Sequence, residues 1–291
     1  MGTADIVTKE YMRGNAVFAD AFNYLIYNGK KVIDPAKLKE IDPTEIALPF
    51  DDEEKAGKEK DGEDKNRKAQ GTEWSSVKNE SVRKKTAGRA GKKTDAVQRY
   101  RDLLKFAVIK QDERTSYVLL GIENQTDVHY AMPVRNMLYD AMQYNQQVTE
   151  IAEKHKGKKG GKRQQKISTG EFLSGFYKNN KLIPVITLVL FFNPGEWDGP
   201  RSLFDMLDIS NPIFKKYAQD YKIHIISPKE ILESDLKKFS SSLREVIGCI
   251  KYSNDKNKLA AFIQDNPRMN IEVEAARVLE VITHTHIKRE E

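Results

Sequence analysis

The sequence has a single cysteine and no long apolar run. Cys249 cannot form a disulfide within the chain, and we expect it to be a core side chain. The most hydrophobic run, residues 183–192, is far shorter than the roughly 18 apolar residues that a membrane-crossing helix needs. The polar first fifteen residues lack the basic and apolar blocks of a secretion signal. We therefore expect a cytoplasmic location and no membrane partner.

Two further absences narrow the function classes. The sequence contains no phosphate-cradling glycine loop, so we expect no nucleotide cofactor. It also shows no internal repeat, which argues against a solenoid or a propeller. With 291 residues, 39% hydrophobic and 32% charged, the chain has the composition of a globular protein with one large domain. Oligomeric state is not encoded in any of these patterns.

The net charge of +6 comes from two low-complexity stretches. Residues 66–95 hold nine Lys or Arg against three acids, and residues 154–166 hold seven against none, so the rest of the chain is acidic. Residues 51–95 carry too few large apolar side chains to offset the entropy of ordering, which predicts a disordered insertion. A second insertion is expected at 154–168. Such basic stretches attract the phosphates of DNA without sequence preference, although simple solvation is an equal alternative.

Hydrophobic periodicity predicts an α/β fold. Phe18, Phe22, Leu25 and Ile26 recur at helical spacing, and Gly29 ends that helix. Residues 102–109 and 116–123 are two apolar runs separated by a short polar loop, which predicts an antiparallel hairpin in the middle of a sheet.

Further elements follow along the chain. A helix is expected from Met132 to beyond Tyr144, followed by a buried strand at 183–192. A strand at 223–227 leads into a helix whose start is marked by Ser227-Pro-Lys-Glu230 and whose apolar stripe extends to Ile250. The remaining C-terminal residues also have a helical pattern.

The hairpin offers a candidate metal site. If its loop is centred between Asp112 and Glu113, Asp102 lies directly opposite Glu123, with Cβ atoms about 5 Å apart. Gln125 projects to the same side because side chains alternate along a strand. Two adjacent carboxylates repel, and a divalent cation such as Mg²⁺ or Mn²⁺ relieves that repulsion. Such an ion can activate water for phosphodiester hydrolysis.

Several segments occur in an order that resembles a bacterial family. The sequence is similar to the recombination-promoting nuclease and transposase family, a branch of the PD-(D/E)XK nuclease superfamily. The similarity covers roughly residues 11–230 apart from the two low-complexity stretches. The segments that carry it are Phe18-Ala-Asp-Ala-Phe-Asn23, Tyr100-Arg-Asp-Leu-Leu104, Gly121-Ile-Glu-Asn-Gln125, Met132-Pro-Val-Arg135 with Tyr139, and Trp197-Asp-Gly-Pro-Arg-Ser-Leu203.

The resemblance implies a restriction-endonuclease-like core, with a central mixed β-sheet flanked by helices, that cleaves DNA in a metal-dependent reaction. It implies that Asp102 and Glu123 are the metal ligands. Gln125 stands where the superfamily usually has lysine, and an amide can position water but supplies no positive charge. The hairpin pair is not accompanied by a three-carboxylate strand-transfer set, which argues against transposase activity.

Other residues are candidates for supporting roles. Asp20 is a possible further acid in catalysis, with a solvent-facing helical acid as the alternative. Arg135 and Tyr139 lie four apart on one helix face, so they can clamp a phosphate or brace Glu123, and a structural salt bridge by Arg135 is an equal alternative. Arg201 lies in a Gly/Pro-containing loop and can contact DNA or serve structure.

These observations combine into one hypothesis and two rivals. We expect residues 1–227 to form the nuclease-like domain and residues 228–291 a helical C-terminal extension. The expected activity is that of a Mg²⁺-dependent DNA endonuclease, recombination-promoting or associated with a mobile element. The first rival is a catalytically silent nuclease fold that binds DNA. The second is a protein-interaction accessory whose charged stretches only solubilise it.

Overall fold

A computed structural model describes residues 2–41, 44–47, 97–111, 114–156, 167–266 and 271–284. The chain divides into two units, one formed by Met1–Ile46 with Gln98–Glu291 and the other by Ala47–Val97. Nearly all described residues belong to the first unit. The insertion expected at 51–95 lies outside the described residues, and so does most of the one expected at 154–168, of which Lys154 to Lys156 continue a helix.

A five-stranded mixed sheet forms the centre of the first unit, in the order β1-β4-β5-β6-β7. β4 (Leu103–Gln111) and β5 (Arg114–Gln125) are antiparallel, as the sequence predicts. β6 (Val185–Phe191) and β7 (His224–Ile226) continue the sheet in parallel, and the short β1 (Lys39–Glu40) pairs antiparallel with β4. The predicted α/β class with a central mixed sheet is confirmed.

Both faces of the central strands are buried, which explains their apolar composition. On one face, Leu120 and Ile122 of β5 join the largest hydrophobic core. On the other face, Leu119 packs with Leu104 and Val185. β2 (Thr44–Ala47) and β3 (Val97–Tyr100) form a separate two-stranded sheet, and η1 (Pro35–Lys37) precedes β1.

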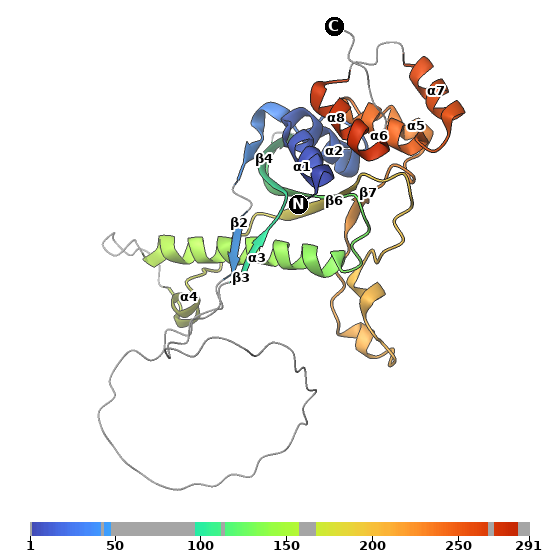
Figure 1. Cartoon of the computed structure of the whole chain (residues 1–291). Coiled ribbons are helices and arrows are strands. Elements are labelled where there is room, and N and C mark those ends of the chain that lie inside the picture. Colours follow the sequence, from blue (N-terminus) through green and yellow to red (C-terminus); the bar gives the residue numbers. More distant parts are fainter. Residues whose placement is uncertain are drawn as a thin grey trace, which may run out of the picture. The chain divides into compact units, whose positions relative to one another are not determined.

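Four helices cover one face of the sheet (Figure 1). They are α1 (Thr3–Arg13), α2 (Asn15–Tyr27), α6 (Leu243–Tyr252) and α8 (Val273–Thr283). Their apolar side chains share one core with β4, β5 and β6. α2 ends at Tyr27, and the next two residues, Asn28 and Gly29, adopt positive φ angles of 54° and 87°, so the helix end predicted near Gly29 is confirmed.

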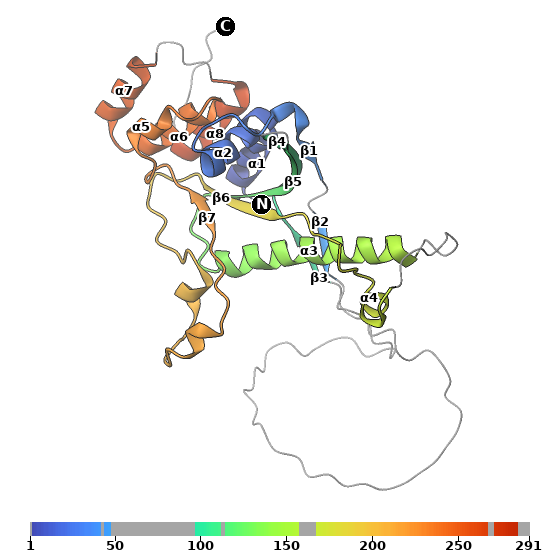
Figure 2. The ribbon, with the colours of Figure 1, turned by 180° about the vertical axis from the view of Figure 1, so that it is seen from behind.

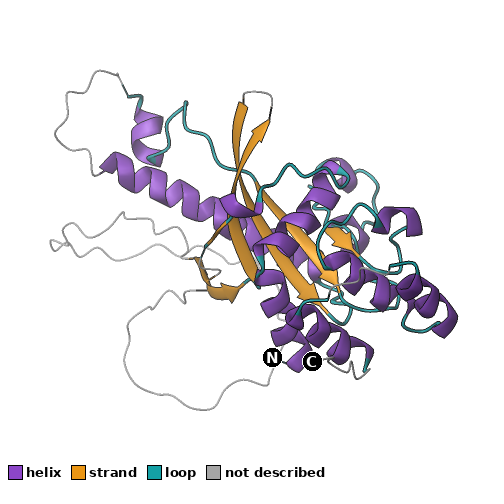
Figure 3. Cartoon of the chain, turned by 90° about the horizontal axis from the view of Figure 1, so that it is seen from above, coloured by secondary structure: helices purple, strands orange, loops and turns teal. Residues whose placement is uncertain are grey.

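The opposite face is crossed by α3 (Met132–Lys156), as the view from behind shows (Figure 2). Seen from above, α3 runs far beyond the strands, and α4 (Thr169–Ser174) lies beside its C-terminal end (Figure 3). The amide of Val185 donates a hydrogen bond of 3.0 Å to the Tyr144 hydroxyl, which ties α3 to the start of β6. The expected helix beginning near Met132 is confirmed.

The single long helix expected from Ser227 to Ile250 is wrong. Ser227 to Glu230 form a turn, followed by the short helix α5 (Glu233–Leu236), and α6 begins only at Leu243. The amides of Ser240 and Ser241 donate to the carboxylate of Asp20 instead of to carbonyls one turn earlier, so a helix cannot continue through them.

Residues 228–291, which were expected to form a helical C-terminal extension, contain the helices α5 to α8 in their described part. α7 (Lys256–Gln264) lies between α6 and α8 in the sequence. Leu243 and Val246 of α6 and Val278 of α8 belong to the same core cluster as Phe18 of α2. The C-terminal helices are therefore part of the same compact unit as the sheet. Within the described ranges, no helix has the length and apolarity required to traverse a lipid bilayer.

Candidate active site

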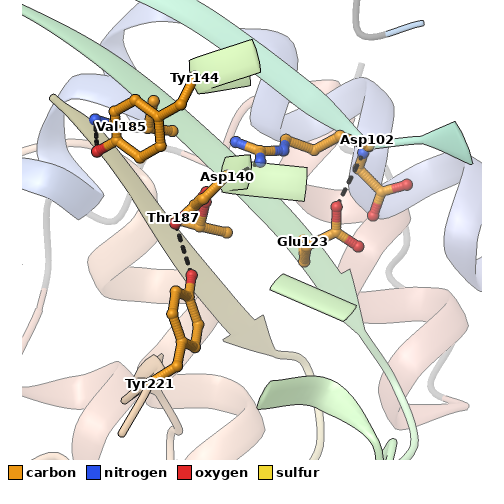
Figure 4. Close-up of polar contacts among 8 residues, drawn as sticks. Asp102, Glu123, Asp140, Tyr144, Val185, Thr187 and Tyr221 are labelled. Carbon is orange, nitrogen blue, oxygen red and sulfur yellow. Dashed lines mark hydrogen bonds and ion pairs between the residues drawn. The ribbon is translucent and has the colours of Figure 1, made fainter. Parts of the chain in front are cut away.

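The register of the hairpin places Asp102 across from Glu123, as predicted. The first pair of the β4–β5 ladder is Leu103 with Ile122, so Asp102 lies one residue before β4 and opposite Glu123. The amide of Asp102 donates to Oε1 of Glu123 at 3.4 Å, and the amide of Asn124 donates to Oδ2 of Asp102 at 2.9 Å. Figure 4 shows the two carboxylates side by side.

Burial shifts the protonation of both acids. Glu123 has an exposed fraction of 0%, and this burial, together with the negative charge of Asp102, raises the pKa of its carboxyl group to about 8. Burial also raises the pKa of the Asp102 carboxyl group, against the opposing effect of the Asn124 amide. Two adjacent carboxyl groups with raised pKa values are a feature of functional sites as well as of structural networks.

Among the residues that the structure describes, Arg135 of α3 supplies the positive charge paired with Glu123. Its Nη2 lies 2.9 Å from Oε2 of Glu123, and its Nε donates to the Tyr139 hydroxyl at 3.2 Å. Arg135 and Tyr139 therefore contact each other on one helix face, as their spacing predicts, and Arg135 forms an ion pair with Glu123. The Arg135 side chain is 32% exposed, so this cation is also accessible from solvent.

Gln125 lies two residues beyond Glu123 and therefore on the same face of β5. Its side chain is partly buried, and its Nε2 donates to the backbone oxygen of Asn124 at 2.8 Å. The side-chain oxygen of this amide accepts no hydrogen bond from the described part of the chain. Gln125 is thus close to the acidic pair in sequence and in register, without a direct contact to either carboxylate.

Asp20 and Arg201 lie elsewhere. The Asp20 carboxylate is buried and accepts five hydrogen bonds of 2.7 to 3.1 Å from the amides and hydroxyls of Ser240 and Ser241. Asp20 is thus neither a solvent-facing acid nor in contact with the hairpin pair. Arg201 forms an exposed ion pair with Glu230. The structure does not bring these two side chains to Asp102 and Glu123.

A buried network that the sequence analysis did not single out lies beside the acidic pair (Figure 4). The Arg101 side chain has an exposed fraction of 0%, and its Nη2 donates to Oδ1 of Asp140 at 3.0 Å. Asp140 also accepts hydrogen bonds of 2.6 Å from Thr187 and from Tyr221. Asp140 therefore links the residue before Asp102 to α3, β6 and the segment leading to β7.

Gly121 makes room for this network. A Cβ atom at this position would overlap Nη1 of Arg101 and lie 3.0 Å from its Cδ. The guanidinium carbon of Arg101 also lies 5.4 Å from the centroid of the Tyr139 ring. The absence of a side chain at Gly121, within a central strand, is what allows the Arg101 side chain to approach the backbone this closely.

The acidic pair fits a hard divalent cation in its ligand chemistry. Carboxylate oxygens are what Mg²⁺ and Mn²⁺ prefer, and magnesium usually takes one or two carboxylates and completes its shell with water or phosphate. Two carboxylates are what this site supplies, since no group of three or more His, Cys, Asp or Glu suited to a metal occurs among the described residues. Asp102 is partly exposed, which gives the pair access to solvent.

Cys249 of α6 is buried in the largest hydrophobic core, as expected. Burial raises the pKa of its thiol to about 11, so it is a protonated, unreactive side chain at neutral pH.

No family model matches this chain, and neither a curated protein nor a solved structure matches it. The resemblance to the recombination-promoting nuclease family stays a prediction from the quoted segments.

Proposed function

We propose that the protein is a metal-dependent DNA endonuclease with a restriction-endonuclease-like core. The observation that supports this best is the adjacent carboxylate pair, Asp102 and Glu123, fixed by reciprocal backbone hydrogen bonds at the end of a buried hairpin. A rigid pair of acids in a mixed sheet is the arrangement that the superfamily resemblance implies for metal ligation.

Each residue of the site has a proposed role. Asp102 and Glu123 hold Mg²⁺ or Mn²⁺, which when bound polarises the phosphodiester and lowers the pKa of an attacking water. Gln125 positions that water through its side-chain oxygen. Arg135, with Tyr139 behind it, contacts the phosphate of the substrate. Within the described part of the chain, Arg201 pairs with Glu230 and contacts neither acid of the pair, so we assign it only a role in binding DNA.

Arg135 favours the ionised form of Glu123 when no cation is bound, but burial and the charge of Asp102 outweigh this effect. In the structure its guanidinium provides the only side-chain positive charge within 4 Å of Glu123 among the described residues. A guanidinium released from Glu123 can donate to a phosphate instead, because a phosphodiester, like a carboxylate, offers two oxygens that accept hydrogen bonds from it. Arg135 thus pairs with Glu123 in the metal-free protein and with the substrate phosphate in the complex.

Nicking of supercoiled plasmid tests the proposal. The wild-type protein should nick plasmid with Mg²⁺ or Mn²⁺ and not with EDTA, and Asp102→Ala or Glu123→Ala should abolish the activity. Glu150→Gln, which changes an exposed acid of α3, is a matched control and should nick as the wild type does. Nicking that survives both site substitutions would mean that the activity comes from another site or from a contaminant.

A second candidate is a nuclease fold that binds DNA without cutting it. The ion pair between Arg135 and Glu123, and the amide of Gln125 in place of lysine, favour this reading. Equal DNA binding with and without metal, and no nicking under either condition, would support it. A protein that binds no DNA at all would instead favour a protein-interaction role.

A further inference from the structure

The segment between β6 and β7 makes an excursion from the sheet. It leaves after Phe191 and returns at His224, and in Figures 1 and 2 it extends on the side of the sheet that α3 covers. Its base is closed by an antiparallel bridge between Ser202 and Lys222. Residues 203–221 between these bridge partners are called the 203–221 arm.

The tip of this arm exposes apolar side chains. Ile213, Phe214 and Tyr217 are 49%, 59% and 78% exposed. Single exposed apolar side chains are ordinary, but three within five residues at the end of an excursion indicate a contact surface. The tip is also ordered locally, because the amide of Phe214 donates to the oxygen of Asn211 at 3.0 Å and the amide of Ala218 to that of Phe214 at 2.9 Å.

The tip is positively charged. Lys215 and Lys216 lie between the two aromatic residues in the sequence, and residues 211–217 contain no acid. Both lysines are exposed. Two lysines flanked by two aromatic rings, in the run Phe214-Lys-Lys-Tyr217, suit a polyanion that also presents flat apolar faces. A nucleic acid with unpaired bases is such a polyanion.

The acids of the arm lie outside its tip, and two of them are engaged within the fold. Asp205 accepts hydrogen bonds from the amides of Arg201 and Ser202 at 2.9 and 2.8 Å. Asp220 accepts one from the amide of Phe204 at 3.0 Å. Asp208 is exposed and also lies outside residues 211–217. A symmetric contact between two copies of the tip would bring the lysines of both copies together, which electrostatic repulsion disfavours.

The base of the arm is attached to the candidate active site. The Tyr221 hydroxyl donates to Oδ2 of Asp140 at 2.6 Å, and Asp140 also binds Arg101, the residue before Asp102. Burial and the charge of Asp140 raise the pKa of the Tyr221 phenol, so this donor keeps its proton. The arm and the acidic pair are thus connected through one buried carboxylate.

We propose that the 203–221 arm binds DNA with unpaired bases. Phe214 and Tyr217 stack on the bases, and Lys215 and Lys216 contact the phosphates beside them. The inference rests on the proposed function, which makes DNA the partner, and adds a substrate class: single-stranded DNA or DNA with distorted, opened bases.

Binding in EDTA separates this inference from catalysis, because no cleavage is expected there. The full chain is titrated into a single-stranded oligonucleotide that contains 2-aminopurine, and into the same sequence as a duplex. Phe214→Ala with Tyr217→Ala should weaken binding to the single strand about tenfold or more, from the loss of two stacking contacts. It should also remove the change in 2-aminopurine fluorescence. Ile263→Ala, which truncates an exposed apolar residue of α7, should change neither.

The salt dependence distinguishes the lysines from the rings. Lys215→Gln with Lys216→Gln should reduce the slope of log affinity against log salt by about 1.4 on a single strand, because two phosphate contacts are lost. The aromatic double variant should leave that slope unchanged.

Two outcomes would overturn the inference. One is wild-type affinity and fluorescence in the aromatic double variant. The other is a wild-type protein that self-associates in sedimentation, with the variant monomeric and its DNA affinity intact, since the tip would then be a contact between copies. Weakened DNA binding by the variant in a protein that never nicks plasmid would support the arm and contradict only the nuclease proposal.

Discussion

Asp102 and Glu123 are held together by two hydrogen bonds that run in opposite directions across the hairpin. The amide of Asp102 donates to the Glu123 carboxylate, and the amide that follows Glu123 donates to the Asp102 carboxylate. Each acid is therefore positioned by the backbone of the other strand. A shift of the register by one residue would turn the two side chains to opposite faces of the sheet. The register of the hairpin therefore determines whether the two carboxylates can bind one cation together.

Removal of the Asp140 carboxylate should destabilise the protein strongly. Asp140→Ala removes the carboxylate that pairs with the wholly buried guanidinium of Arg101, and breaking a buried ion pair typically costs about 3–5 kcal/mol. Urea unfolding measures the change. Glu230→Ala is the control, because it breaks the exposed ion pair with Arg201 and should cost about 0–1 kcal/mol. Equal costs for the two variants would show that the buried network contributes no more than a surface pair.

Gly121→Ala should also destabilise the fold, because the added methyl group overlaps Arg101 in a space that the sheet and α3 close. We expect a loss of about 1–3 kcal/mol, typical of overpacking. Gly170→Ala is the matched control in the short helix α4, where an added Cβ meets no atom within 4 Å. That substitution should be neutral or stabilising by up to about 1 kcal/mol. A thermal melt of both variants makes the comparison.

Asp20→Ala should lower stability by about 2–4 kcal/mol, because the hydrogen bonds from Ser240 and Ser241 to a charged acceptor are lost. Hydrogen exchange should become faster at the amides before α6. Asp208→Ala, an exposed acid, serves as the control. Nicking per folded molecule should stay at the wild-type rate. A folded variant without nicking would instead identify Asp20 as a further acid of the reaction.

The metal-free protein should become less stable as the pH rises from about 4.5 to about 8. The Glu123 carboxyl group has a pKa of about 8 in the folded protein and an ordinary value of 4.5 when unfolded, so within this window the unfolded chain has released a proton that the folded chain retains. The free energy of unfolding should fall by at most about 1.4 kcal/mol per pH unit and level off above pH 8.

Glu123→Gln should flatten this dependence, since a neutral amide does not titrate. Glu150→Gln, on the exposed side of α3, should retain the wild-type slope. Urea unfolding in EDTA at several pH values provides the measurement. An unchanged slope in the Glu123 variant would mean that another group is responsible for it.

The fold was predictable where one pattern dominates. Apolar runs without interruption indicated the central strands, and a short polar loop set the β4–β5 register that brings Asp102 to Glu123. The long C-terminal helix was not predictable in this way. Its apolar stripe continues through residues 237–242, and only the distant Asp20, which captures the amides of Ser240 and Ser241, interrupts the helix there.

The two acids of the site could be predicted from the sequence, but the buried network beside them could not. Alternation along β5 places Glu123 and Gln125 on one face, and helical spacing places Arg135 with Tyr139. The network around Asp140 joins residues that are far apart in the sequence and share no motif, so no local pattern indicates it. Arg101 occurs in one of the quoted segments, but a buried arginine is rare enough that its side chain would be expected at the surface.

Crystals of the protein soaked in Mn²⁺ provide the most direct test of the central claim, that Asp102 and Glu123 jointly hold a divalent cation. We predict an anomalous peak within about 2.0–2.3 Å of one oxygen from each carboxylate, and no such peak in crystals of Glu123→Gln. The absence of a peak at the pair, at an Mn²⁺ concentration that supports plasmid nicking, would contradict the account.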